Sequence, residues 1–202
     1  MRLKDGLDPL LGSPTKLRLL RKLLATPGRR WTGRELAAAA RVSTAQAARD
    51  LDDFLQVGIL LRDVQGRSYA WSVNEGHVLA PTLSQLFHAE ASLRDALARD
   101  VGGLLAGVPV RRARLFGSVA RGDERADSDV DLFVQVGTAD ERASVDSALE
   151  KIRDRVWIRF GNPLAALVYT DAETRHPRNP SLLGAIDREG VEVTPGGAGG
   201  AD

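Results

Sequence analysis

Apolar residues recur at helical spacing in three segments near the beginning of the chain, at residues 14–26, 33–40 and 44–57. Each segment follows a serine or threonine that can serve as its N-cap, and the first also has a proline at its first helical position. Two strand-like runs, 59–62 and 68–73, flank a Gln-Gly turn. The pattern therefore predicts three helices followed by a β-hairpin.

The second half of the chain alternates between strand-like and helical patterns. Before it, an apolar stripe along residues 79–104 predicts one long helix or two shorter ones. Further on, the runs predicted as strands are 113–116, 130–136, 164–170 and 191–193, and those predicted as helices are 143–155 and 182–189. This mixture of helices and strands predicts an α+β fold.

The order of these elements divides the chain into parts. We expect an N-terminal domain at residues 1–75, a helical linker at 76–107, and a mixed β-sheet domain with flanking helices at 108–195. A glycine-rich tail, 196–202, follows without an assigned role. The stripe in the linker has two interpretations, burial against one of the domains or pairing with its copy in a homodimer.

Composition narrows the class of protein. With 43% hydrophobic and 27% charged residues among 202, the chain is not of the disordered class. It has no cysteine, which excludes disulfides and thiolate metal sites. No run approaches the ~18 apolar residues of a membrane span, and the first residues lack the apolar core of a signal peptide. We therefore expect a cytoplasmic protein without a membrane partner.

Charge is distributed unevenly along the chain. Residues 1–75 hold 13 Lys and Arg against 8 Asp and Glu, a net charge of +5, whereas residues 76–202 have a net charge of −4. A basic N-terminal domain suits a polyanionic partner such as duplex DNA, although a solvated surface with uneven charges gives the same balance.

The sequence ELAAAARVSTAQAARDLDDFLQVGIL resembles the winged helix-turn-helix family, and the resemblance covers roughly residues 14–74. It implies that the third helix enters the major groove of DNA and that the hairpin forms the wing. The residues then expected at the DNA are Ser43, Thr44, Gln46 and Arg49 on the helix and Arg62 and Arg67 on the wing. Protein binding or dimerisation is the alternative role of such a domain.

Residues 111–134 read RRARLFGSVARGDERADSDVDLFV and carry the candidate chemistry. Gly117 permits a sharp turn from strand to helix, where free amides and the Ser118 hydroxyl can hold phosphate oxygens. Asp129 and Asp131 are two residues apart on a strand, so both side chains point to one face and can bind Mg²⁺. Arg121 and Arg125 can neutralise triphosphate charge.

This string resembles the nucleotidyltransferase superfamily related to DNA polymerase β, in particular its small "minimal" members. The matching residues are Phe116-Gly117-Ser118, Arg121-Gly122 and Ser128-Asp129-Val130-Asp131-Leu132. The resemblance implies a nucleoside triphosphate as substrate and Mg²⁺ as cofactor. Asp129 and Asp131 are then the catalytic metal ligands, and the nucleotide is held by Gly117, Ser118, Arg121, Arg125 and Ser128.

The chain departs from the family at a third acid, which active members carry on the strand after the long helix. Ala165 or Ala166 occupies that place here, and Asp171 lies beyond the strand end. Two functions therefore stay open. One is transfer of a nucleoside monophosphate to a hydroxyl, including antitoxin-like modification of a protein partner such as a cognate toxin. The other is transcriptional regulation by a degenerate domain that binds a nucleotide or a partner without turnover.

Overall fold

The computed structural model describes residues 7–66, 68–123, 125 and 128–196, and the chain divides into two compact units, Met1–Ala91 and Ser92–Asp202. The stretch expected as a linker contains two helices, α5 (Ala80–Ala91) and α6 (Leu93–Leu104). Apolar residues of α5 belong to the core of the first unit, and those of α6 to the core of the second. Residues 197–202 of the expected tail lie outside the described residues.

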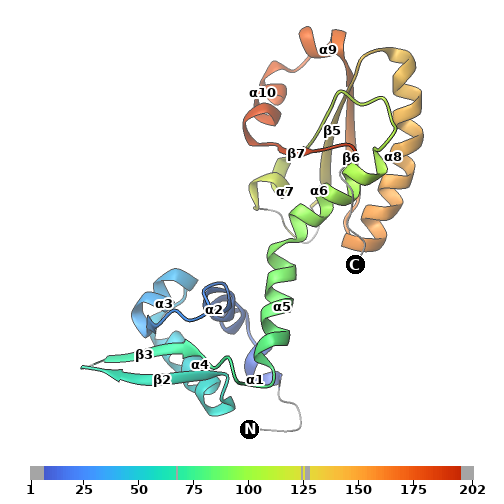
Figure 1. Cartoon of the computed structure of the whole chain (residues 1–202). Coiled ribbons are helices and arrows are strands. Elements are labelled where there is room, and N and C mark those ends of the chain that lie inside the picture. The colour runs from blue at the N-terminus through green and yellow to red at the C-terminus, as the bar shows by residue number, and fades with distance from the viewer. Residues whose placement is uncertain (1–6, 67, 124, 126–127, 197–202) are drawn as a thin grey trace. The chain divides into compact units, whose positions relative to one another are not determined.

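The N-terminal unit contains the three helices and the hairpin that the apolar pattern predicts, in the predicted order (Figure 1). Its elements before α5 are α1 (Asp8–Leu11), α2 (Pro14–Leu24), β1 (Trp31–Thr32), α3 (Gly33–Ala40), α4 (Thr44–Val57), β2 (Leu60–Gln65) and β3 (Ser68–Val73). The three strands form an antiparallel sheet in the order β1-β3-β2. The short helix α1 is an element that the sequence pattern did not predict.

Local capping sets the helix boundaries of this unit. The Ser13 and Ser43 side chains accept hydrogen bonds from Lys16 and Gln46 backbone amides at the starts of α2 and α4. Thr32 and Glu35 form a reciprocal capping box at the start of α3. Because these bonds satisfy amides that lack a partner inside the helix, the starts could be read from the sequence.

The C-terminal unit is a four-stranded mixed sheet with helices on both faces. After α6, its elements are β4 (Arg112–Phe116), α7 (Gly117–Arg121), β5 (Val130–Val136), α8 (Ala139–Phe160), β6 (Leu164–Thr170), α9 (Asp171–Arg175), α10 (Pro180–Glu189) and β7 (Val191–Val193). The strand order is β6-β5-β4-β7, with β5 and β6 parallel and the other pairs antiparallel. The predicted mixed α+β fold is thus confirmed.

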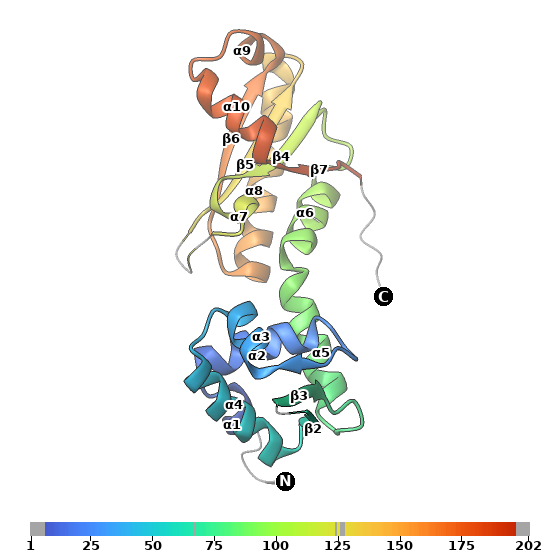
Figure 2. The same ribbon diagram turned by 90° about the vertical axis from the view of Figure 1, so that its left-hand side faces the viewer.

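The two faces of this sheet have different coverings. Leu132 and Val134 of β5 are buried in one core with residues of α6 and α8, whereas Phe133 between them packs with Leu183 and Ile186 of α10. In Figure 1, α10 and α8 lie on opposite sides of the strands, and the turned view of Figure 2 brings α10 and α7 to the front. Asp131 alternates with Leu132, so it shares the α10 face.

The long helix α8 extends further at both ends than the predicted 143–155. It begins after Thr138, which forms a capping box with Glu141, and it ends at Gly161, where φ is 77°. The short helix α9 was also missed, because its apolar content is low and its start depends on a cap at Thr170. None of the helices in the described part of the chain combines the length and apolar character needed to cross a bilayer.

Candidate functional site

The turn from β4 into α7 brings the backbone directly against an acidic side chain. Phe116 pairs with Asp131 in the antiparallel register of β4 and β5, and Gly117 follows with φ of 71°. A Cβ atom built on Gly117 would lie 2.2 Å from Asp131 Oδ2. Both the positive φ and this close approach require glycine.

Asp131 and Asp129 form a pair of neighbouring carboxylates at the start of β5. Asp129 is exposed, and Asp131 is half-buried beside the glycine turn. Burial raises the pKa of Asp131, and the charge of Asp129 raises this pKa further, whereas Arg121 opposes the rise. Two carboxylates whose charges repel each other are a donor set that fits Mg²⁺, because a divalent cation relieves the repulsion. Among the residues described, no cluster of three or more acids or histidines is suited to a metal ion.

The strand register shows which alanine stands beside this pair. Asp131 is the register partner of Ala165 across the parallel strands β5 and β6, and Ala165 is exposed. Ala166 points to the other face, where it packs against the core beneath α6 and α8. Since partners on adjacent strands point to the same face, Ala165 is the residue nearest to the place of a third acid.

Asp171, the other acid considered, is held at the opposite end of the strands. Gln135 Nε2 donates a hydrogen bond of 2.8 Å to Asp171 Oδ1. Gln135 is four residues beyond Asp131 on β5, a separation of about 13 Å along the strand. Asp171 therefore does not join the carboxylate pair.

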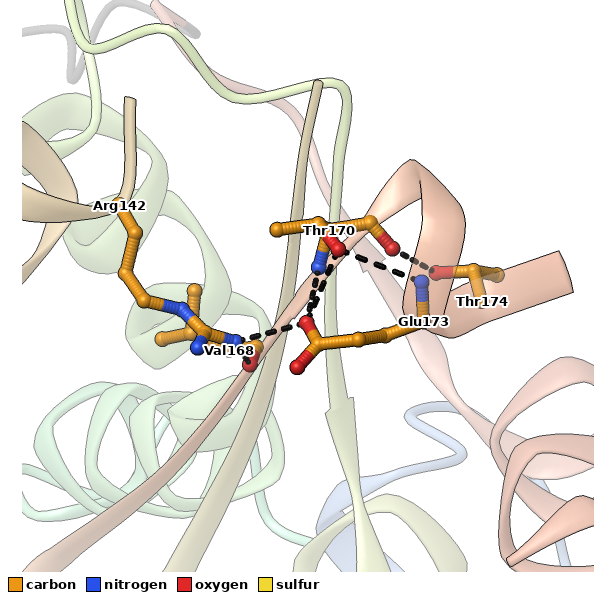
Figure 3. Close-up of polar contacts among 5 residues, drawn as sticks. All are labelled: Arg142, Val168, Thr170, Glu173 and Thr174. Atoms are coloured by element: carbon orange, nitrogen blue, oxygen red, sulfur yellow. Dashed lines mark hydrogen bonds and ion pairs between the residues drawn. The ribbon is translucent and has the colours of Figure 1, made fainter. Parts of the chain in front are cut away.

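A network at that end of β6 fixes the entry into α9 (Figure 3). Arg142 of α8 donates to the carbonyl of Val168 and, at 2.9 Å, to Glu173. Glu173 accepts the Thr170 amide at 2.8 Å, and this bond to the backbone lowers the pKa of Glu173. The Thr174 hydroxyl donates to the Thr170 carbonyl at 2.9 Å, so these hydrogen bonds join the end of the strand to the helix.

The residues expected at the phosphates differ in exposure and in the partners that they already have. Ser118 is half-buried in the first turn of α7, and no hydrogen bond of its hydroxyl is found within the described residues. Arg121 is already engaged, since it lies 3.1 Å from Asp123 and 3.7 Å from Glu189 of α10. Arg125 is exposed, and its backbone amide donates to Ser128 Oγ at 2.9 Å.

Hydrogen bonds to the backbone on both sides of Asp129 hold this residue in position. The Asn162 side-chain amide donates to the Ser128 carbonyl at 3.0 Å, and the Val130 amide donates to the Pro163 carbonyl at 2.8 Å. Asn162 is not among the site residues that the sequence pattern predicts. Its position in an Asn-Pro pair directly before a strand is the sequence signal for a side chain that hydrogen-bonds to the backbone.

On α4, the residues expected at DNA are linked to one another. Ser43 Oγ accepts the Gln46 amide at 3.2 Å, and Thr44 is exposed. Arg49 donates to Gln46 Oε1 at 2.6 Å, and Gln46 Nε2 donates to Asp50 Oδ1 at 2.8 Å. The side chain of Gln46 is thus engaged on both sides, which its position in the sequence did not indicate.

Arg62 lies on the hairpin against aromatic rings. Its guanidinium is 4.5 Å from the ring centre of Tyr69 and 5.6 Å from that of Trp71, and it lies 3.6 Å from Asp52 of α4. Asp53 of the same helix pairs with Lys16 at 2.6 Å. The acids on the later turns of α4 are therefore offset by basic side chains. Arg67, the second expected wing residue, lies outside the described residues.

A groove of about 630 Å³ lies between the start of α3, the first half of α4 and strand β3. Its lining residues are Thr32, Gly33, Arg34, Thr44, Ala48, Leu51, Ser68, Tyr69 and Trp71. Arg34, an exposed cation at this groove, was not among the residues singled out from the sequence. Its place two residues after the Thr32 cap, in the first turn of a helix, is the local signal for it.

Comparison with known proteins bears on the second unit. Residues 106–170 match the family described as "Polymerase beta, Nucleotidyltransferase", so this part of the chain is a nucleotidyltransferase domain, as its Gly-Ser and Asp-Val-Asp strings predicted. No curated protein matches the chain. A solved structure described as a "Possible transcriptional regulator from Methanosarcina mazei Go1" is similar at 15% identity and a TM-score of 0.34, over 48% of this chain and 84% of that one. A similarity at this score does not define a shared fold.

Proposed function

We propose that the chain is a cytoplasmic DNA-binding protein whose nucleotidyltransferase domain binds a nucleoside triphosphate with Mg²⁺. One observation gives the strongest support to the nucleotide site. Asp131, whose carboxylate lies within the electrostatic influence of Asp129, stands directly against the Gly117 turn, and a Cβ atom at Gly117 would lie 2.2 Å from Asp131 Oδ2 and displace it. A carboxylate pair beside a glycine turn joins metal ligands to the backbone amides that suit phosphate oxygens.

In this proposal the residues of the domain have separate tasks. Asp129 and Asp131 hold Mg²⁺, which neutralises triphosphate charge when it is bound. Gly117 and the hydroxyl of Ser118, which has no hydrogen-bond partner among the described residues, contact phosphate oxygens. Arg121 reaches the triphosphate only after leaving Asp123 and Glu189, so nucleotide binding competes with two ion pairs of the free protein.

We further propose that transfer is slow. Transfer forms a bond from an acceptor hydroxyl oxygen to the α-phosphorus, breaks the bond from that phosphorus to the bridging oxygen, and releases pyrophosphate. The hydroxyl proton must pass to a base, and Ala165 offers none beside Asp131. If an acceptor such as a cognate toxin supplies this base, the chain acts as a modifying enzyme, and otherwise as a regulator that senses a nucleotide.

The N-terminal unit is proposed as a winged helix-turn-helix domain that binds duplex DNA. The groove between α4 and β3 supports this role, because exposed Thr44 and Arg34 line it together with aromatic residues of β3. Phosphates attract exposed cations, and side chains at the start of α4 would then face the bases. A homodimer is the arrangement that we propose for binding to two half-sites.

Calorimetry with Mg²⁺-ATP and Mg²⁺-GTP tests the nucleotide site. The full chain should bind at least one of them, and Asp129→Ala/Asp131→Ala should remove the binding. Asp146→Ala is the matched control, since Asp146 is an exposed acid of α8 on another part of the domain. Equal affinity of the double variant and the wild type would reject the site.

A further inference from the structure

Asp50 of α4 is a buried acid next to the proposed DNA surface. Its side chain is only 2% exposed, although it follows directly after exposed Arg49. Asp50 Oδ1 accepts the hydrogen bond from Gln46 Nε2, and within the described residues Oδ2 has no hydrogen-bond partner. A buried carboxylate with so few partners is costly to maintain, which points to a role other than stability.

The side chains of Asp50, Gln46 and Arg49 form a series of hydrogen bonds in which each donor and acceptor is fixed. A carboxylate only accepts hydrogen bonds and a guanidinium only donates them, so the amide between them has one possible orientation. Gln46 Nε2 must face Asp50, and Gln46 Oε1 must face Arg49, at 2.8 Å and 2.6 Å. Asp50 thereby orients Gln46, and Gln46 orients the guanidinium of Arg49.

This arrangement leaves Gln46 and Arg49 with different capacities to contact a base. Pairing with adenine uses both the oxygen and the nitrogen of a glutamine amide, and both are already engaged in Gln46. Arg49 is exposed and, among the described residues, one of its N–H groups is bonded, to Gln46, so its other donors remain for O6 and N7 of guanine. A guanidinium held in place also loses less rotamer freedom on binding.

We infer that Arg49 is the base-reading residue of this protein, specific for guanine, and that Gln46 and buried Asp50 are positioning residues that aim it. The inference rests on the proposed DNA binding and names what that surface recognises. It narrows the expectation that both Gln46 and Arg49 contact DNA.

The test is selection of duplexes from a randomised library by the full chain, followed by affinities for the selected site and its single-base variants. Arg49→Ala, Arg49→Lys and Gln46→Ala should all relax preference at the same G·C pair. For Arg49→Ala, the discrimination against other bases, about 5- to 150-fold for a bidentate pair, should disappear. Gln56→Ala, which changes an exposed glutamine in the last turn of α4, should leave the preference unchanged.

A second readout concerns Asp50 and does not require DNA. In nuclear magnetic resonance spectra of the free full chain, the Gln46 side-chain amide protons should shift with Asp50→Asn and stay unchanged with Gln56→Ala. Asp50→Asn should also weaken the guanine preference, because an asparagine amide can donate as well as accept and no longer fixes Gln46. If Asp50→Asn left the Gln46 amide protons unshifted, the hydrogen bond between Gln46 and Asp50 would not exist in solution.

Three outcomes on DNA separate the inference from its premise. If Gln46→Ala relaxes a different, A·T pair, Gln46 reads adenine itself and the inference is wrong. If Arg49→Ala weakens all sequences equally, Arg49 contacts phosphate and the inference is again wrong, while DNA binding stands. If the wild type binds no duplex at low ionic strength, the proposed DNA binding fails and the inference fails with it.

Discussion

Ala165 lies directly opposite Asp131 across the parallel strands β5 and β6, on the face that carries the candidate metal site. Its methyl group is exposed, so a longer side chain at this position has room to extend beside the carboxylates. Ala166, the next residue, packs instead against the core beneath α6 and α8. One strand thus provides two alanines in opposite environments.

Ala165→Asp should raise the rate of nucleotidyl transfer by about 10²–10⁴-fold, the usual contribution of a general base. At the least, it should strengthen the binding of a second divalent ion, because it adds a third carboxylate beside Asp131. Transfer of label from each of the four nucleoside triphosphates to candidate acceptors measures the first effect, and calorimetry with Mn²⁺ the second.

Ala166→Asp is the matched control for this substitution. It places the same acid one residue along β6 and should give neither effect, while lowering the melting temperature because a charge enters the apolar core. Rapid transfer by the wild type that Asp129→Ala abolishes would contradict the proposal of a slow enzyme, since another group would then complete the site.

Gly117→Ala should abolish binding of Mg²⁺-NTP and destabilise the fold. A left-handed backbone costs a residue with a Cβ about 1–2 kcal/mol, and here the added atom also displaces the Asp131 carboxylate. Gly122→Ala separates the two causes, because Gly122 has φ of 72° and open space around its Cβ position. Calorimetry and thermal unfolding should show similar backbone strain in both variants, with loss of binding only in Gly117→Ala. Loss in both would mean that strain alone is responsible.

Arg62→Ala should reduce the salt dependence of DNA binding. Each phosphate contact contributes about 0.9 to the slope of log K against log salt concentration, so the slope should fall by that amount. Asp52→Asn should act oppositely on affinity, because it removes the carboxylate 3.6 Å from the Arg62 guanidinium. Fluorescence anisotropy over a range of KCl concentrations measures both. Arg153→Ala, in the nucleotidyltransferase domain, should leave the slope unchanged.

Glu90→Gln should lower the stability of the N-terminal unit at neutral pH and have no effect in acid. Arg21 of α2 donates two hydrogen bonds of 2.6 and 2.7 Å to Glu90 of α5, and these bonds lower the pKa of the Glu90 carboxyl. A carboxyl with a lowered pKa stabilises the fold above its unfolded-state pKa, and this contribution is lost as the pH falls through the folded-state pKa.

Because Arg21 and Glu90 are both partly exposed, the expected loss at pH 7 is about 0.5–1 kcal/mol. Urea unfolding of the full chain between pH 3 and 7 measures it. Glu75→Gln changes an exposed acid of the same unit and should leave stability nearly constant across the range. A difference between Glu90→Gln and the wild type that persists at pH 3 would contradict the assignment.

The boundaries of many elements could be predicted from the sequence because they depend on neighbours in the chain. Ser43 and Gly58 delimit α4 through bonds that reach only three to five residues along the backbone. The same holds for the glycine turn that leads from β4 into α7. Where caps were not recognised, as at Thr138 and Thr170, the boundary of α8 and the existence of α9 were missed.

The sequence by itself therefore determined the order of the elements, the α+β class and the residues that bear the candidate chemistry, since each depends on spacing within a short segment. Only the tertiary structure decided that Ala165 stands beside Asp131 and that Asp171 is held by Gln135. It also decided that Arg121 is paired with Glu189. These relationships join residues far apart in the chain, and the register of the strands and the docking of the helices fix them, which no local pattern contains.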